Sequence, residues 1–169
     1  MIFKPMLRAI RILLIGPPSD RFRATFRAMV ALRERGYHRL ARLLSFRLQA
    51  YGVHIAPKAR VPASLIFPHP TGIVIGEGVV IEDDVTIYQS VTLGGRNTGA
   101  WRTDNYPTVG AGTVIFAGAV LIGRITVGKN CTIGANSVVT QDIPDNLTAV
   151  GAPARIVVAQ KILTKSADL

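Results

Sequence analysis

Residues 109–139 read VGAGTVIFAGAVLIGRITVGKNCTIGANSVV, and an apolar residue returns at every sixth position of this stretch. The same spacing continues toward the N-terminus, broken by one interval of eight residues and one of sixteen. Thirteen positions follow it: Ile55, Val61, Phe67, Ile75, Ile81, Ile87, Leu93, Val109, Ile115, Leu121, Val127, Ile133 and Val139. A fixed internal period of this kind indicates a solenoid, in which each repeat stacks on its neighbours.

The residues around these anchors indicate what kind of solenoid it is. Four residues after most anchors comes a small or β-branched residue: Ala59, Leu65, Val79, Val85, Val91, Thr113, Ala119, Ile125, Cys131 and Ser137. Glycine often follows an anchor directly, as in Ile75-Gly76 and Val127-Gly128, and glycine permits sharp corners. The sequence therefore predicts a mainly β fold, a parallel β-helix with triangular coils of about eighteen residues and both sets of positions inside.

The two long intervals mark where the coil is interrupted. The interval between Phe67 and Ile75 contains His69, and the interval between Leu93 and Val109 contains a run that must leave the coil as an external loop, residues 96–107. Insertions in repeat proteins usually gather on the binding face. We therefore expect the functional site near these two interruptions.

A different periodicity precedes the coils. Apolar residues recur at three- and four-residue steps over residues 20–51, which predicts helix with Ser19 or Asp20 at its start and Gly36 dividing it in two. Gly52 and the prolines after it end the helical pattern. The predicted organisation is a basic arm with helices (1–52), a β-helix domain (53–158) and a C-terminal tail (159–169).

Composition narrows the classes of protein. The chain has 169 residues, 49% of them apolar and 18% charged, which suits one folded domain with a substantial core. A single cysteine, Cys131, cannot form an internal disulfide, so a cytoplasmic location is expected. The net charge is +10, with eight arginines between Arg21 and Arg47, which favours an anionic partner. Nucleic acid, an anionic membrane surface, an acidic glycan, a phosphorylated cofactor and a merely solvated helix face all fit that charge.

Three motifs carry a resemblance to a known family. They are HPTGIVIG (residues 69–76), QSVTLGG (89–95) and GAPAR (151–155). In order and spacing they resemble the serine acetyltransferase branch of the hexapeptide acyltransferases, over roughly residues 37 to 158. The resemblance implies a left-handed β-helix, a homotrimer, acetyl-CoA as acetyl donor and active sites between subunits.

The resemblance also implies roles for individual residues. His69 matches the general base, and a base that works near neutral pH suits the activation of a hydroxyl for attack on a thioester. Gly94 and Gly95 match a glycine-rich turn whose N–H groups stabilise the tetrahedral oxyanion. The remaining CoA positions are Ala117 and Ala135, which leave room for the pantetheine arm, and Lys129 and Arg155, which pair with phosphates or are ordinary surface charges.

The chain departs from the family in the acceptor site. His54 stands where serine acetyltransferases hold the aspartate that orients the base, Ala56 replaces the following histidine, and Pro68 replaces an acidic residue that contacts serine. An arginine-histidine pair is replaced by Asn105-Tyr106. These departures favour a sugar hydroxyl as acceptor, as in the small acetyltransferases of exopolysaccharide clusters. Other groups would then orient His69: Glu77, Glu82, Asp83, Asp84 or a backbone carbonyl. Alternatively, His54 sits beside His69 as a like-charged neighbour.

The expected function is therefore acetyl-CoA-dependent O-acetylation of a sugar in a polysaccharide or its precursor, with the acceptor contacting His54, Trp101, Arg102 and Tyr106. Aromatic rings beside polar groups make a carbohydrate platform, although Trp101 suits subunit packing equally well. Two alternatives remain: a serine O-acetyltransferase, and a non-acetylating hexapeptide trimer or zinc enzyme. Three dispersed histidines argue against zinc, so no metal is expected. A further hypothesis places residues 1–47 on an anionic inner membrane, and nucleic acid is not the expected partner.

Overall fold

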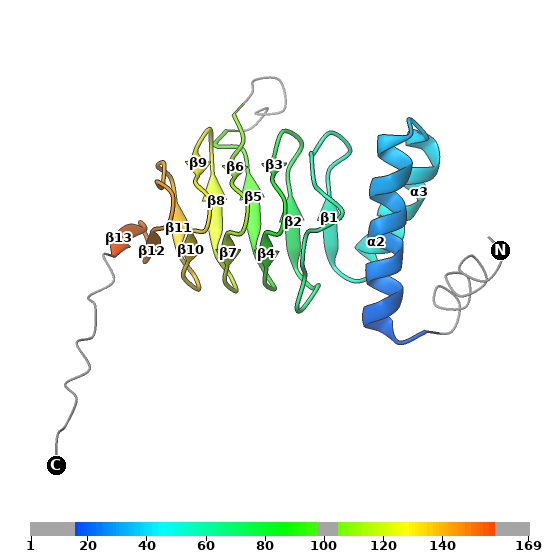
Figure 1. Cartoon of the computed structure of the whole chain (residues 1–169), viewed down its shortest axis with the longest axis horizontal. Coiled ribbons are helices and arrows are strands. Elements are labelled where there is room, and N and C mark those ends of the chain that lie inside the picture. The colour runs from blue at the N-terminus through cyan, green and yellow to red at the C-terminus, as the bar shows by residue number, and fades with distance from the viewer. Residues whose placement is uncertain (1–15, 98–104, 158–169) are drawn as a thin grey trace, which may run out of the picture.

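The computed structural model describes residues 16–97 and 105–157, which form a three-sided stack of coils capped at one end by two helices (Figure 1). Helix α2 spans Pro18–Glu34 and helix α3 spans His38–Gln49. They are separated at Gly36, which has a positive φ of 80°, as the sequence predicts. Trp101 and Arg102 lie outside the described residues.

The predicted start of the helical region is wrong by two residues. Helix α2 begins at Pro18, with Pro17 as its N-cap, and no side chain caps it, so neither Ser19 nor Asp20 plays that part. Proline suits the first helical turn because its missing N–H would have no intrahelical partner there. Asp20 instead lies in the first turn, where a negative charge is favourable.

The coils build three faces of parallel strands. The first face orders β1 (Val53–Ile55), β2 (Ile73–Ile75), β5 (Thr92–Gly94), β8 (Val120–Ile122) and β11 (Val138–Val139). The second orders β3 (Val80–Ile81), β6 (Thr108–Val109) and β9 (Thr126–Val127). The third orders β4 (Thr86–Ile87), β7 (Val114–Ile115), β10 (Thr132–Ile133) and β12 (Thr148–Val150), and antiparallel β13 (Arg155–Val157) follows β12.

Three edges join these faces, and each has a name below. The His69 edge leads from the third face to the first and contains residues 67–72, 88–91, 116–119 and 134–137. The loop edge leads from the first face to the second, and its described residues are 76–79, 95–97, 105–107 and 123–125. The distal edge leads from the second face to the third and contains residues 82–85, 110–113 and 128–131.

The interior is filled as the sequence predicts. Eleven of the thirteen anchors are buried, and so are all ten residues placed four positions after an anchor. The exceptions, Val61 and Phe67, are only partly buried because the first coil lies against the helices. The ring of Phe67 meets Phe22 and Phe26 of α2 edge-on, at centroid distances of 5.4 and 5.2 Å.

A second contact ties α2 to the first coil. The Nη1 of Arg33 donates a hydrogen bond of 3.4 Å to the backbone oxygen of Ala59. Partial burial lowers the pKa of Arg33, and the carboxylate of Glu77 partly offsets that effect. The cap is therefore held by both an aromatic cluster and a polar contact.

Strand register locates the two interruptions. Ile75 pairs with Leu93, eighteen residues later, as the regular coil requires. Ile55 pairs with Ile75, which lies twenty residues later, so the first coil holds two extra residues, and His69 lies in its corner. Leu93 pairs with Leu121, twenty-eight residues later, so this coil holds ten extra residues, and they fall between β5 and β6 at the loop edge. Within the described residues, no helix is long and apolar enough to cross a membrane.

Candidate active site

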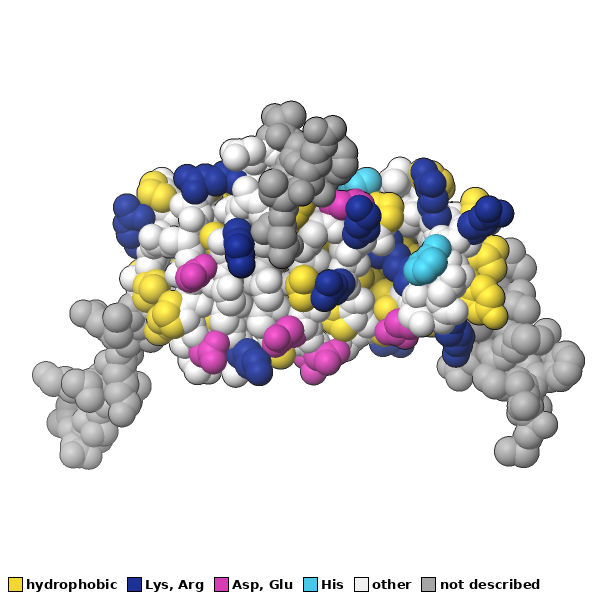
Figure 2. Space-filling model, turned by 90° about the horizontal axis from the view of Figure 1, so that it is seen from above, with side chains coloured by type: hydrophobic (Ala, Val, Ile, Leu, Met, Phe, Trp, Pro, Cys, Tyr) yellow, Lys and Arg dark blue, Asp and Glu magenta, His cyan; other side chains and the backbone are white. Residues whose placement is uncertain are grey.

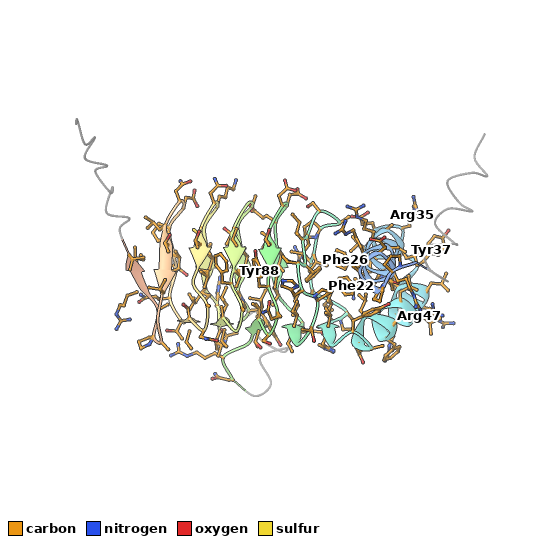
Figure 3. All side chains as sticks on the ribbon, turned by 90° about the horizontal axis from the view of Figure 1, so that it is seen from below. Phe22, Phe26, Arg35, Tyr37, Arg47 and Tyr88 are labelled. Carbon is orange, nitrogen blue, oxygen red and sulfur yellow. The ribbon has the colours of Figure 1, made fainter. Side chains whose placement is uncertain are left out.

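His69 lies at the beginning of the His69 edge, exposed to solvent between Pro68 and Pro70. Its ring lies 6.3 Å from the ring of Tyr88 in the next coil, and Tyr88 stacks on Phe116 of the coil after that, at 5.1 Å. Figure 3 shows Tyr88 near the middle of the stack. An aromatic wall therefore runs along the coils from the imidazole.

Small side chains line the same edge beside that wall. The N–H of Gly118 donates to the oxygen of Gln89, and the N–H of Asn136 donates to the oxygen of Ala117, so successive coils stack in register here. Ala117 is half-buried and Ala135 is exposed. The edge thus combines His69 with the two alanines that the resemblance assigns to CoA.

The side chain of Gln89 is unusual on this edge. Its Oε1 is buried and accepts no hydrogen bond from any residue in 16–97 or 105–157. A buried carbonyl oxygen without a partner costs free energy, roughly 1–3 kcal/mol.

The predicted oxyanion glycines lie elsewhere. Gly94 ends β5 at the loop edge, where its oxygen accepts from the N–H of Gly123. Tyr106 lies at the same edge, with its ring so close to the backbone that a Cβ on Gly78 would be 2.5 Å from it. Strand β5 separates this edge from the His69 edge, and three strand residues span about 10 Å. One chain therefore does not bring Gly94 and Gly95 to its own His69.

The predicted phosphate-binding residues are also apart from His69. Lys129 is exposed on the distal edge, where its backbone N–H donates to Asp145 Oδ1 at 2.8 Å. Arg155 is exposed on β13, at the end of the stack away from the helices. The predicted residues thus fall on all three edges and one end.

His54 does not take the place of the missing aspartate. It is exposed on β1, opposite Val74, and its Nδ1 lies 3.5 Å from Nε2 of Gln49 in α3. Neither His54 nor any other described side chain forms a hydrogen bond with the His69 ring.

Two of the four carboxylates considered as orienting groups have other partners. Glu82 Oε2 accepts from the N–H of Ala111, and Asp83 Oδ1 accepts from the hydroxyl of Ser64 at 2.7 Å. Over residues 16–97 and 105–157, no three His, Cys, Asp or Glu side chains come close enough to hold a metal ion.

Sequence reasoning missed Tyr88 and Phe116. Both stand directly after an anchor, where other repeats have glycine, as in Gly134 after Ile133. A large aromatic residue at a corner position that is usually glycine could have indicated an outward-facing aromatic surface. Its side chain must point outward, since the anchor before it fills the interior.

Comparison with known proteins places this geometry in a family. A model described as bacterial transferase hexapeptide (six repeats) matches residues 106–141. A serine acetyltransferase of Helicobacter pylori is 44% identical over 134 residues, which cover 78% of this chain and 77% of that protein. This chain belongs to the serine acetyltransferase family.

Other family members extend the comparison. The serine acetyltransferase of Haemophilus influenzae is 48% identical over 120 residues, which cover 71% of this chain but 44% of that protein, so the chain spans less than half of its length. A solved serine acetyltransferase in complex with CoA superposes with a TM-score of 0.70 at 40% identity, covering 91% of this chain and 63% of that one. These similarities confirm the predicted left-handed β-helix of hexapeptide repeats.

The prediction of a polysaccharide acceptor is wrong. The relatives that match at 44–48% identity are serine acetyltransferases, and so is the structure solved with CoA. That prediction gave more weight to the departures at His54 and Pro68 than to the three motifs shared with serine acetyltransferases. Together with Asn105 and Tyr106 they are local substitutions in a serine acetyltransferase framework.

Proposed function

We propose that this chain transfers the acetyl group of acetyl-CoA to the hydroxyl of serine. One observation carries the proposal: within this family framework, His69 presents an exposed imidazole at the head of an edge lined by Ala117 and Ala135. A base that is open to solvent and lies on an edge of small side chains can reach both a hydroxyl and a thioester. The serine acetyltransferase of Haemophilus influenzae is a longer protein, of which this chain covers 44%. Serine acetylation is therefore a proposal for this chain.

In this mechanism His69 accepts the serine hydroxyl proton as the oxygen attacks the thioester carbonyl carbon. The tetrahedral oxyanion that forms is stabilised by backbone N–H groups. The carbon–sulfur bond then breaks, and the imidazolium returns its proton to the CoA thiolate. The products are O-acetylserine and CoA, so protons and charges balance.

CoA fits the His69 edge chemically. The pantetheine arm is long and narrow, and Ala117 and Ala135 leave room for it beside the Tyr88–Phe116 wall. Lys129 can bind a phosphate only if CoA reaches the distal edge, and Arg155 only if CoA reaches the end of the stack away from the helices.

A homotrimer would complete this site. The glycines assigned to the oxyanion lie on the loop edge, separated from His69 by a strand of the same chain. A neighbouring subunit that packs its loop edge against the His69 edge would supply them. Light scattering on the purified protein should give about three times the 18.2 kDa chain mass, and a monomer that retains full activity would exclude the shared site.

The decisive test of the proposed function is product formation. We expect CoA release that depends on L-serine, with O-acetylserine identified by mass spectrometry. Threonine and glycerol serve as control acceptors, because each carries a hydroxyl group whose neighbouring groups differ from those of serine. Absence of serine-dependent CoA release by the trimer would reject the proposed function.

We also propose that helix α3 holds the protein on an anionic membrane surface. Leu40, Leu43 and Phe46 are each more than half exposed, Arg42 lies between the two leucines, and Arg39 and Arg47 flank the set. Helix α3 contains no acidic residue. Figure 2 shows hydrophobic and basic side chains together at the helical end of the molecule. Apolar residues interleaved with arginines are typical of helices that bind anionic lipid.

Sedimentation with vesicles tests the membrane proposal. The chain should sediment with phosphatidylcholine vesicles that contain phosphatidylglycerol, and less so as salt rises. The double variant Leu43→Ser/Phe46→Ser should sediment less, while the control Lys58→Gln, exposed on the first coil, should not change. Equal sedimentation with and without the anionic lipid would reject it.

A further inference from the structure

A cleft lies between α2 and the first coil, next to the proposed base. Its volume is about 460 Å³, and Phe22 and Phe26 of α2 line it together with Phe67 of the coil. Figure 3 shows Phe22 and Phe26 on the side of the helices that faces the coils. The cleft is therefore part of the junction between the cap and the stack.

The position of the cleft relative to His69 follows from its wall. Pro68 and Pro70 both line it, and they are the residues directly before and after His69. Consecutive Cα atoms are about 3.8 Å apart, so a ligand touching both prolines lies within about one residue of the His69 backbone. The two neighbours of His69 line the cleft and His69 itself does not, so an occupant lies beside the base and not against its ring.

The charged side chains that line the cleft are both positive. Arg23 and Arg27 of α2 line it, one helical turn apart and therefore on the same face of the helix. Both are exposed, and neither forms an ion pair or a side-chain hydrogen bond with another described residue. Among the residues that the structure describes, no aspartate or glutamate lines the cleft. Two free guanidinium groups at the mouth of an apolar cleft favour an anion.

The remaining polar groups of the cleft do not offset that charge. The hydroxyl of Ser64 donates to Asp83 and accepts from the N–H of Asp84 at 3.1 Å, so it is already engaged. The acidic contact that the family places before the base is Pro68 here, which cannot bind an ammonium group. The cleft is thus built to hold the negative end of an acceptor.

We infer that Arg23 and Arg27 bind the carboxylate of the acceptor and direct its hydroxyl toward His69. This inference rests on the proposed function, since it assigns a contact for serine. The guanidinium group binds a carboxylate with two parallel hydrogen bonds, which fixes orientation as well as affinity. Recognition by helix α2 takes the place of the arginine that the family carries where this chain has Asn105.

Kinetics with a matched pair of acceptors test the inference. For Arg23→Gln/Arg27→Gln we expect the KM for L-serine to rise at least about tenfold, because charge-assisted hydrogen bonds are lost. The KM for acetyl-CoA should stay within about twofold, since the pantetheine edge is untouched. Serinamide, which lacks the carboxylate, should show a high KM with the wild type and no further rise with the double variant.

The control is Arg21→Gln, on the same helix but outside the cleft. Its KM for serine should equal that of the wild type, and Arg23→Lys/Arg27→Lys should recover part of the loss. Thermal unfolding of each variant should match the wild type, because both arginines are exposed. A double variant with the wild-type KM for serine would overturn the inference.

Calorimetry in the presence of CoA separates this inference from the proposed function. Serine that binds more tightly than serinamide, and loses that advantage in Arg23→Gln/Arg27→Gln, supports the carboxylate contact even where no acetyl transfer follows. Equal binding of serine and serinamide overturns it, whatever the turnover.

Discussion

The coils and the helical cap bury their apolar residues by different means. In the coils each interior residue stacks on its equivalent in the next coil, so Leu93 lies under Leu121, and Ile115 under Ile133. In the cap, Phe22 and Phe26 have no equivalents, and both rings pack edge-on against Phe67 of the first coil. The coils therefore repeat one packing arrangement at every level, whereas the packing of the cap occurs once.

The difference explains where chemistry is found. A regular coil presents the same surface at every level, so it has no unique site. His69 lies where the first coil has two extra residues, and the arginine-lined cleft lies where the cap meets that coil. Both features occur at the junction of the two regions.

The largest expected effect on stability comes from disrupting the aromatic packing between the cap and the first coil. Phe26→Ala should lower the free energy of unfolding by about 3–5 kcal/mol, because a buried ring is replaced by a cavity. The control Leu43→Ala, on the outer side of α3 and 61% exposed, should cost less than about 0.5 kcal/mol. Urea denaturation measures both. Equal costs would mean that the cap does not pack on the coils.

A smaller effect is expected at a corner of the coil. In Gly110→Ala the new Cβ would lie 2.6 Å from the backbone carbon of Gly128 in the next coil, so the coils must move apart, at a cost of about 1–3 kcal/mol. Gly94→Ala is the control, since its Cβ meets only a methyl group at 3.8 Å. A shift in the melting temperature for Gly94→Ala as large as for Gly110→Ala would contradict the stacking described.

The smallest of the three stability effects concerns a polar group inside the coil. The buried Thr113 hydroxyl donates to the oxygen of Gly128 and accepts from the N–H of Cys131 at 3.0 Å. Thr113→Val keeps the shape and leaves both partners unsatisfied, which should cost about 1–2 kcal/mol. Thr126→Val, on an exposed strand position, should change little. An unchanged urea midpoint for Thr113→Val would mean that water replaces the hydroxyl.

Sequence alone predicted the coils well and the site only in part. The six-residue period identified nearly the whole interior, because every anchor faces the same environment. It failed at Val61 and Phe67, whose burial depends on how the cap packs and not on the repeat.

The site depends on contacts that no local pattern contains. His69 was found through its motif, yet Gly94, Lys129 and Arg155 are distributed over the loop edge, the distal edge and the far end, since the period does not state which residues share an edge across subunits. Arg23 and Arg27 looked like part of a solvated helix face. Only the packing of α2 on the first coil brings them into one cleft with Pro68 and Pro70, the neighbours of the base.

The central claim is that His69 is the base of an acetyl transfer to serine, and its removal tests this most directly. His69→Ala should lower kcat with L-serine by a factor of about 10² or more, with the affinity for CoA nearly unchanged. The control is His38→Ala, an exposed histidine at the start of α3, which should turn over serine like the wild type. Unchanged turnover in His69→Ala, or an equal loss of CoA affinity and turnover, would contradict the account.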